Sequence, residues 1–556
     1  MNQSFNLKTI MNLKQSLEST FKGELLDTQA DLVARANDAS IFELMPRLVA
    51  RPQNTDDIKA IVRFVSEHKK DDPSISLTAR AAGTGMAGGA LTESIVLEMG
   101  NLNAIKEVTA EHAIVEPGVF FRDLEQATLA KNRIMPAYPA SKSICSVGGM
   151  VGTNAGGEKT LNYGSTERYV QNLKVVLADG NEYSFGPLSK TELDQKMTMQ
   201  TFEGEVYRRV YNLIEANYDV IAQAKPRVSK NSTGYALWNV WDRTTFDLTK
   251  LFTGSEGTLG ITTEITFGLV EPRPASKLLV VFIKDLAILP NLVKKILIHK
   301  PETFESYDDN TFKFAVRFFP DIAKSLKARG LATLAFRFLP EVMMILRGGV
   351  PKLVLLAEFV GTTEVEATEQ AIRAQKDIEE FAVKSKITTS KEDAEKFWTI
   401  RHESFNLLRH HGGKKRTAPF IDDIIVSPEY LPEFLPRLTK LMNEYNLTYT
   451  IAGHIGDGNM HIIPLMDLRN ARERDIILEL GEKVFDLTFE FKGSMSAEHN
   501  DGLIRTPFLR QMYGDTIYRL FEETKNIFDA QNIFNPGKKV FGNDMTYIKE
   551  HIDRVY

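Results

Sequence analysis

The chain has 556 residues, of which 43% are hydrophobic and 25% are charged, and its formal net charge is −5. This length exceeds what one hydrophobic core organises, so two or three domains are expected, and the slightly acidic balance does not suggest a nucleic-acid partner. Cys145 is the only cysteine, which excludes an intrachain disulfide and an iron–sulfur cluster held by thiolates. No signal-peptide pattern and no run of 18 apolar residues is evident, so we expect a cytoplasmic protein.

The first glycine-rich segment runs from Gly83 to Gly89 and follows strand-like residues 75–79. Its Gly83-x-Gly85-x-x-Gly88 spacing matches the dinucleotide fingerprint, but a Rossmann loop opens a crossover helix of about ten or more residues. Here only residues 90–94 separate the glycines from the next strand, residues 95–98. The spacing therefore predicts a loop whose backbone N–H groups hold phosphate without a helix behind it.

Two more glycine clusters follow, at residues 146–157 and at residues 252–261, and the second leads into a strand at residues 261–267. Glycine lets the main chain approach a ligand closely. Each cluster alone is also what an ordinary turn would look like. Three such clusters, each beside a strand-like run, favour one large extended ligand that is bound mainly by backbone.

The segment 320–352 is basic and apolar in a protein whose net charge is negative. A buried helix pair would explain its apolar residues but not its cations, whereas an element that docks on a membrane surface or a partner explains both. We therefore expect salt-sensitive binding through this segment, to the inner face of a membrane or to a partner. Its six cations are Lys324, Lys327, Arg329, Arg337, Arg347 and Lys352.

A tight turn between two strand-like runs, residues 447–452 and 460–465, carries His454 and His461. Facing Cβ atoms across a strand pair lie roughly 5 Å apart, which suits two imidazoles that bind one cation at about 2.0–2.1 Å. Glu498, followed by His499, offers a carboxylate as a third ligand. The alternative is that one histidine caps the turn and the other is an ordinary hydrogen-bonded residue.

These segments together resemble a known family. Residues 51–58, 83–89, 116–119, 143–157, 173–180 and 254–261 resemble the FAD-binding domain of the vanillyl-alcohol oxidase type, also called the PCMH type. The turn from His454 to His461 and the closing residues 534–538 are similar to the branch of FAD-linked D-2-hydroxyacid dehydrogenases, which act on D-lactate, D-2-hydroxyglutarate or glycolate. Residues 141–149 and 416–423 resemble the flavin half of long members that also carry an iron–sulfur module.

The resemblance implies an α+β protein. Residues 1–45 are expected to form a helical segment, and residues 46–273 two α+β subdomains that bind FAD. Residues 274–490 would form an α+β cap for the substrate and the metal, and residues 491–556 would return to the FAD domain. The pattern agrees with this division, with strands expected at residues 278–283 and 353–360 and a helix at residues 364–383.

The resemblance also implies which residues contact FAD. The covalent members attach the flavin through His or Cys, and because the loop from Gly83 to Gly89 has neither, we expect non-covalent binding. The expected FAD contacts are Arg80, Ala82, Gly83, Thr84, Gly85, Met86, Ala87, Gly88, Pro117, Gly118, Pro139, Ser146, Val147, Gly148, Gly149, Gly152, Thr153, Asn154, Gly156, Gly157, Gly164, Glu256, Gly257, Gly260, Ile261 and Asn535.

For catalysis, the resemblance implies that His454, His461 and Glu498 hold a divalent metal, for which Zn²⁺ is expected. His499 would be the general base, because an imidazole titrates near neutral pH. Arg401 matches the family position that binds the substrate carboxylate, and a guanidinium suits bidentate binding. Asn459 and Arg416 are further expected substrate contacts, and Arg416 shares a basic cluster with Lys414 and Lys415 in which the contact to a second carboxylate stays open.

The expected activity is FAD-dependent oxidation of a D-2-hydroxyacid, with electrons passed to quinone, a cytochrome or a separate iron–sulfur subunit. Two other functions remain open. A non-catalytic flavin subunit would bind FAD and only pass electrons, but it would not need the two histidines with Glu498 and His499. A metal hydrolase would use the histidines and Glu498 but would leave the three glycine clusters without a role.

Overall fold

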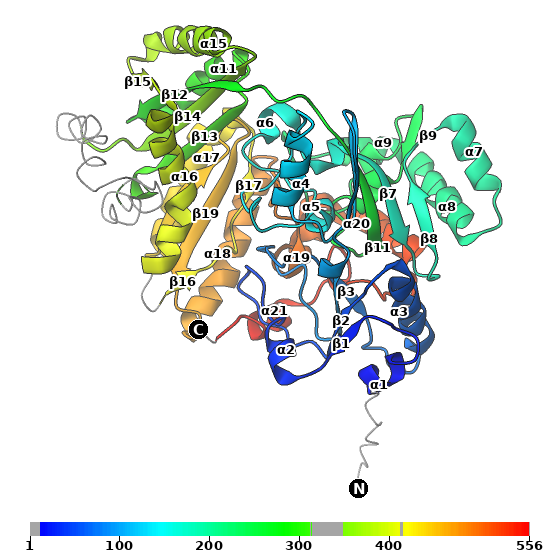
Figure 1. Cartoon of the computed structure of the whole chain (residues 1–556). Coiled ribbons are helices and arrows are strands. Elements are labelled where there is room, and N and C mark those ends of the chain that lie inside the picture. The colour runs from blue at the N-terminus through cyan, green and yellow to red at the C-terminus, as the bar shows by residue number, and fades with distance from the viewer. Residues whose placement is uncertain (1–11, 312, 314–348, 412–414, 555–556) are drawn as a thin grey trace.

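The computed structural model describes residues 12–311, 313, 349–411 and 415–554, with side chains from 403 to 411 left aside. Most of the basic segment 320–352 and Lys414 lie outside the described residues. In Figure 1 the large sheet with α15 and α16 lies on one side, and the sheets of the first half with the helices α7, α8 and α20 lie on the other. No helix in the described part of the chain is both long and apolar enough to cross a membrane.

The first sheet has the order β1-β2-β4-β3. The strands β2 (Leu48–Arg51), β4 (Ile95–Glu98) and β3 (Leu77–Arg80) are parallel, and β1 (Glu24–Leu26) is antiparallel to β2. The segment 1–45, expected to be helical, thus contains the strand β1 as well as helices, and β1 extends this sheet.

The parallel strands β2 and β3 are connected by the helix α3 (Thr55–His68). Asn54 caps this helix by accepting hydrogen bonds from the backbone of Asp56 and Asp57, which satisfies amide groups that have no partner inside the helix. The glycine loop from Gly83 to Gly89 contains no helix before β4 begins. The prediction that it is not a Rossmann loop is confirmed.

The second sheet is antiparallel, with the order β5-β6-β11-β7-β8. In its central strand β11 (Ile261–Gly268), buried and half-buried residues alternate along the whole length, as expected for a strand with one face in the core. Its other strands are β5 (Ile105–Val108), β6 (His112–Val115), β7 (Val170–Val176) and β8 (Glu182–Phe185). A separate pair is formed by β9 (Pro187–Ser189) and β10 (Thr245–Asp247).

The third sheet is the largest, with the order β15-β12-β14-β13-β18-β19-β16 and with β17 paired to β19. The hairpin of β18 and β19 confirms the strands expected on either side of the histidine turn, with Ala452 opposite His461. The strands are β12 (Ala275–Ile283), β13 (Thr303–Asp308), β14 (Leu353–Gly361), β15 (Lys384–Ile387), β16 (Arg416–Thr417), β17 (Ile424–Ile425), β18 (Thr448–Gly453) and β19 (Asn459–Met466).

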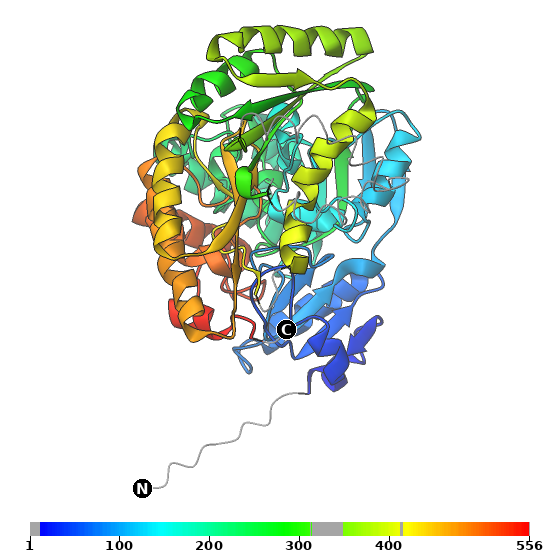
Figure 2. The same ribbon diagram turned by 90° about the vertical axis from the view of Figure 1, so that its left-hand side faces the viewer.

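The two faces of this sheet have different roles. Leu279, Val281 and Ile283 of β12 belong to the large core that also includes residues of α11 (Leu289–Ile298) and α15 (Glu364–Asp377). Phe282 points the other way, and its ring lies 6.3 Å from that of Phe397 on α16 (Lys391–His411). Figure 2 shows α15 across the top of the sheet and α16 in front of it.

The strand registers place Glu305 on the α16 face as well, together with His461, because His461 and Tyr307 both lie opposite Ala452 and Tyr307 is two residues from Glu305. Glu305 lies opposite Leu356, which in turn lies opposite Val280, two residues from Phe282. Because residues opposite each other in neighbouring strands point to the same face, the side chain of Glu305 faces α16.

The C-terminal residues pack back against the first sheet. Phe534 pairs with Leu77, and its buried side chain belongs to the core between β2, β3 and α3.

The bounds of the four segments that the sequence suggests stay predictions. The helices not yet placed are α1 (Leu13–Leu17), α2 (Gln29–Val33), α4 (Phe121–Leu129), α5 (Val147–Thr153), α6 (Thr160–Tyr163), α7 (Lys190–Thr198), α8 (Phe202–Ala216), α9 (Tyr218–Ala224), α10 (Thr249–Phe252), α17 (Leu431–Glu444), α18 (Ala471–Glu490), α19 (Gly502–Arg505), α20 (Leu509–Phe528) and α21 (Met545–Glu550).

Candidate active site

The three glycine clusters converge on one place. The backbone N–H of Glu256, in the third cluster, donates to the carbonyl of Gly152 in the second, at 2.8 Å. The side-chain amide of Asn535 donates to the carbonyls of Gly89 and Glu256, at 2.9 and 2.7 Å. Asn535 therefore fastens the first cluster to the third from the far end of the chain.

Parts of these loops border open space, as a large ligand bound by backbone requires. A Cβ atom built on Gly85 or on Gly152 would meet no atom within 4 Å. Gly83 and Gly88 have φ angles of +67° and +80°, which L side chains rarely adopt. The cluster geometry therefore fits an extended cofactor such as FAD.

The side chain of Arg80 packs against the first glycine loop at Gly83. Its side chain is 8% exposed and donates to the carbonyl of Asn37 at 2.7 Å. A Cβ atom on Gly83 would lie 2.4 Å from its guanidinium. Arg80 is therefore part of the wall of the loop as well as an expected FAD contact.

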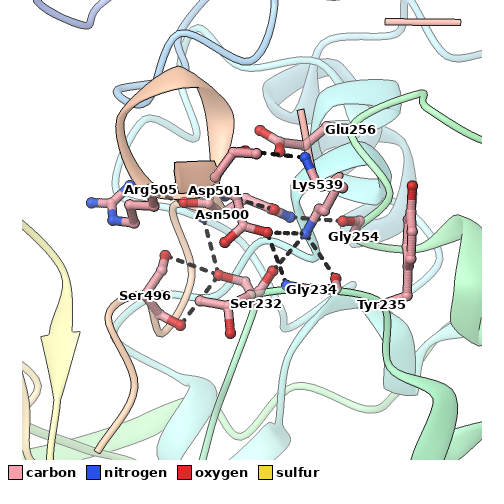
Figure 3. A network of polar contacts seen from close by, with 12 residues as sticks. Ser232, Gly234, Tyr235, Gly254, Glu256, Ser496, Asn500, Asp501, Arg505 and Lys539 are labelled. Carbon is pink, nitrogen blue, oxygen red and sulfur yellow. Dashed lines mark hydrogen bonds and ion pairs between the residues drawn. The ribbon is translucent and has the colours of Figure 1, made fainter. Parts of the chain in front are cut away.

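A buried network attaches the residues after Ser496 to the glycine loops, as Figure 3 shows. The side-chain amide of Asn500 donates to the carbonyl of Gly254 at 2.9 Å, and Asp501 accepts from the backbone of Gly234 at 2.8 Å. Lys539 lies 2.8 Å from the Asp501 carboxylate, and both side chains are fully buried. A buried ion pair needs further hydrogen bonds to be tolerated, and Lys539 donates two, to the carbonyls of Ser232 and Gly234.

The same segment brings the second glycine cluster next to Glu498. A Cβ atom on Gly156 would lie 2.9 Å from Glu498 Oε2 and 2.8 Å from Thr160 Oγ1. No side chain fits between the loop and this carboxylate. The loops expected to hold FAD and the group expected to hold a metal are therefore direct neighbours.

His454, His461 and Glu498 come together as the hairpin predicts. His454 Nε2 lies 3.0 Å and His461 Nε2 3.3 Å from the same oxygen, Glu498 Oε1. The two rings have centroids 5.2 Å apart and are nearly perpendicular. One nitrogen of each ring thus points to the place where the carboxylate oxygen lies.

The other nitrogen of each ring contacts a carboxylate that sequence reasoning did not assign to the site. His454 Nδ1 donates to Glu305 Oε1 at 2.5 Å, and His461 Nδ1 donates to Asp422 Oδ1 at 3.0 Å. Metal-binding histidines commonly donate in this way, because the carboxylate keeps the proton on Nδ1 and leaves Nε2 for the metal. This arrangement fits a metal site.

The electrostatics of the three residues agree with this strong pairing. Burial alone would lower the pKa of His461, but Asp422 and Glu498 raise it to about 10. Burial would raise the pKa of Glu498, but Lys230 and His454 hold it well below its ordinary value. Without a metal, the paired carboxylates therefore favour the protonated form of His461, and Lys230 and His454 favour the ionised form of Glu498.

The described residues whose ligand atoms all lie within 4.8 Å of one another include Asp423 and His499 with His461 and Glu498, but not His454. However, Asp423 Oδ2 already accepts from the backbone of Glu498 and His499, at 2.8 and 2.7 Å, and from Ser496 Oγ. Its other oxygen accepts from the side-chain amide of Asn459 at 3.0 Å. We therefore assign to Asp423 the positioning of the segment that carries Glu498 and His499.

His499 and Arg401, the two expected catalytic residues, both reach this group. His499 Nδ1 lies 2.8 Å from Asp422 Oδ2, and its ring stacks on that of His461 with centroids 5.1 Å apart. Arg401 Nε donates to Glu305 Oε2 at 3.0 Å. The side chain of His499 is 23% exposed, against 13% for His461, so it is the more accessible of these two imidazoles.

The described side chains around this group carry an excess of negative charge. Five carboxylates lie beside three cations, which leaves two negative charges before the histidines are counted: Glu305, Asp422, Asp423, Asp457 and Glu498 against Lys230, Arg401 and Arg505. Buried charge of one sign must be compensated. Protons on the imidazoles or a divalent cation would provide the compensation.

The two other residues expected to contact the substrate differ in position: Asn459 lies beside the histidine group and Arg416 does not. Asn459 is fully buried, and its amide donates to Asp423 and to the carbonyl of Ile424. Arg416 lies opposite Met466, five residues along β19 from His461, which is about 17 Å at the rise of an extended strand. It pairs with Asp553 near the C-terminus. The structure does not bring Arg416 to the histidine group, and its role in substrate binding stays a prediction.

Sequence reasoning missed Glu305, Asp422, Asp423 and Lys230. Asp422 and Asp423 lie within residues 416–423, a segment that resembles the family, and this resemblance could have identified them. Glu305 is a charged residue inside a strand in which every residue is buried, and that burial is visible only in the folded chain. No local pattern marks Lys230, whose amine lies 3.2 Å from Glu498 Oε2.

Comparison with known proteins supports the family resemblance that the sequence shows. The chain is 26% identical over 548 residues to a D-2-hydroxyglutarate dehydrogenase of Escherichia coli, covering 96% of this chain and 52% of that protein, so it spans about half the length of that relative. It is 28% identical to the glycolate oxidase subunit GlcD of Bacillus subtilis, covering 93% of this chain and 94% of that protein.

A solved structure, 4-ethylphenol oxidase from Gulosibacter chungangensis, has the same fold, with a TM-score of 0.64 and 15% identity over 96% of each chain. Residues 46–186 match the family model of an FAD binding domain. Residues 273–539 match the C-terminal domain of FAD linked oxidases. The two matches follow one another and together span most of the chain, so the chain combines an FAD binding domain with the C-terminal domain of FAD linked oxidases.

Proposed function

We propose that this chain binds FAD non-covalently, binds a divalent metal, and oxidises a D-2-hydroxyacid to the 2-oxoacid. The observation that supports the proposal is the close approach of Gly156 to Glu498, where a Cβ atom would lie 2.9 Å from the carboxylate. We infer from it that the glycine loops and the histidine group line one site. The relatives are named for D-2-hydroxyglutarate and glycolate, and both compounds are 2-hydroxyacids.

The two bound groups would supply what side chains lack. FAD supplies a two-electron acceptor for the hydride that leaves Cα of the substrate. A divalent metal, for which we propose Zn²⁺ held by His454, His461 and Glu498, supplies a positive charge that lowers the pKa of the hydroxyl group.

The protein residues would bind the substrate and move its proton. We propose that Arg401 binds the substrate carboxylate, because a planar guanidinium matches the geometry of a carboxylate. His499 takes the hydroxyl proton on Nε2, while the charge of Asp422, whose Oδ2 lies 2.8 Å from Nδ1, favours a proton on Nδ1 and so the correct tautomer. Lys230 and Asp423 keep Glu498 and His499 in place.

The visible spectrum of the purified protein tests this function. Flavin absorption that bleaches when D-lactate, glycolate or D-2-hydroxyglutarate is added without oxygen would support oxidation of that compound. A screen of the three with an artificial dye acceptor would then rank them. Protein that binds flavin but is bleached by none of them would favour the non-catalytic electron-transfer subunit, and protein without flavin would contradict the proposal.

For the electron acceptor we propose a separate iron–sulfur subunit, with quinone or a cytochrome as alternatives. Cys145 is buried and is the only thiol of the chain, so this chain cannot hold a cysteine-ligated cluster. A relative that is named as a subunit is consistent with a partner. Salt-sensitive co-sedimentation of this protein with an iron–sulfur partner or with anionic vesicles would distinguish a protein partner from contact with the inner face of the membrane.

A further inference from the structure

Glu305 contacts two parts of the site that have different tasks. Its side chain is 1% exposed. One carboxylate oxygen, Oε1, accepts from His454 Nδ1 at 2.5 Å. The other, Oε2, accepts from Arg401 Nε at 3.0 Å and lies 2.9 Å from Arg401 Nη2. A single buried group thus touches a proposed metal ligand and the proposed carboxylate clamp.

The position of Glu305 is set by the sheet rather than by a loop. It lies inside β13, between β14 and β18, and the carbonyl of its neighbour Phe304 accepts from the backbone of Gly456 in the histidine turn at 3.1 Å. Strand residues are held more accurately than loop residues. Glu305 is therefore a fixed reference for the side chains of His454 from the turn and of Arg401 from α16.

We propose that Glu305 is a positioning residue that fixes the tautomer of His454 for metal binding and the orientation of Arg401 for substrate binding. This inference rests on the proposed function and adds a residue to it. Only an ionised carboxylate can do both, because both of its oxygens accept hydrogen bonds. An amide of the same shape has one acceptor and one donor.

The substitution Glu305→Gln separates the two contacts. If the amide oxygen faces Arg401, the amide N–H₂ faces His454 Nδ1 and favours the tautomer with the proton on Nε2, which leaves Nε2 without a lone pair for the metal. If the oxygen faces His454, the N–H₂ faces the guanidinium, where two donors meet, and Arg401 is displaced. One of the two tasks must therefore fail, although the volume of the side chain is unchanged.

The experiment uses the full-length protein loaded with FAD. The dissociation constant of Zn²⁺ is measured by competition with a chelator, and KM and kcat are measured with the D-2-hydroxyacid that bleaches the flavin best. We expect Glu305→Gln to weaken Zn²⁺ binding by about 10- to 100-fold, as for other residues that hold a metal-binding histidine, or to raise KM by a similar factor. FAD content should stay near that of the wild type.

Glu358→Gln is the matched control. Glu358 lies on β14, next to β13 and opposite Thr303, and its pKa is raised to about 7 because burial disfavours its charged form. It contacts neither His454 nor Arg401 in any described interaction, so Zn²⁺ affinity and KM should not change. If Glu305→Gln keeps both quantities within about threefold of the wild type, the inference is overturned.

Different results would refute the proposed function and the positioning role of Glu305. Wild-type protein that is bleached by no 2-hydroxyacid refutes the proposed function itself. Wild-type protein that is bleached but binds no divalent ion refutes the metal contact of Glu305, and the KM comparison still tests its contact with Arg401. A loss of FAD and of thermal stability in Glu305→Gln, with unchanged Zn²⁺ affinity and KM in the folded fraction, would show that Glu305 has only a packing role.

Discussion

Gly85 offers a direct test of where FAD lies. A Cβ atom added there would meet no protein atom within 4 Å, and the residue does not have a positive φ angle. In the protein without its cofactor, Gly85→Ala should therefore be neutral or stabilising by about 0.4–1 kcal/mol, because alanine restricts the unfolded chain. If a phosphate of FAD lies against this loop, the new methyl group occupies the space next to the backbone.

The magnitude follows from the contact that would be lost. A hydrogen bond from a backbone N–H to a charged group contributes about 1.5–3 kcal/mol, so the loss of one contact should weaken FAD binding by roughly 10- to 100-fold. FAD affinity is measured by titration of the apoprotein and stability by thermal unfolding of the same sample. Gly100→Ala is the matched control, because a Cβ atom there also meets nothing within 4 Å but the residue lies outside the glycine clusters.

The comparison between the two variants decides the question. Equal FAD affinity in Gly85→Ala, Gly100→Ala and wild type would refute the placement of the cofactor on the first glycine loop. Reduced affinity together with a large loss of stability in Gly85→Ala alone would show that the open space at Gly85 is needed by the fold and not by the cofactor.

Three further predictions follow from the same structure. Glu498→Ala should lose bound metal and turnover but keep FAD, because the glycine loops depend on backbone contacts; equal metal content by elemental analysis would speak against the metal site. His499→Ala should keep the metal and lose about 10²- to 10⁴-fold in kcat, and full activity would exclude it as the base. Burial raises the pKa of Asp308 to about 6 from 3.8, so folding is weakened as the pH rises through this range, by about 3 kcal/mol in total. Asp308→Asn should therefore raise the unfolding temperature relative to wild type at pH ~8 but much less at pH ~4, and an equal difference at both pH values would contradict the assigned cause.

Much of the local structure follows from the sequence. The strands on either side of the histidine turn, the absence of a helix after Gly88 and the convergence of three glycine clusters are all found as expected. These features depend on neighbours in the chain: glycine permits positive φ angles, and a strand needs only a run of suitable residues between turns. The strand β1, in contrast, is a short half-exposed segment whose pairing with β2 could not be seen from its own composition.

The site shows the same division between local and tertiary information. Its two histidines lie on one hairpin, so local spacing was enough to predict that they meet. Glu305, Asp422 and Lys230 come from segments that lie 39 to 268 residues away in the chain from the groups they contact. A buried carboxylate or lysine has its role only through the partners that the fold brings to it, since it cannot remain charged alone in the interior. The sequence by itself therefore determined the local turns, the glycine loops and the histidine pair, and only the tertiary structure decided which charged residues hold them in place.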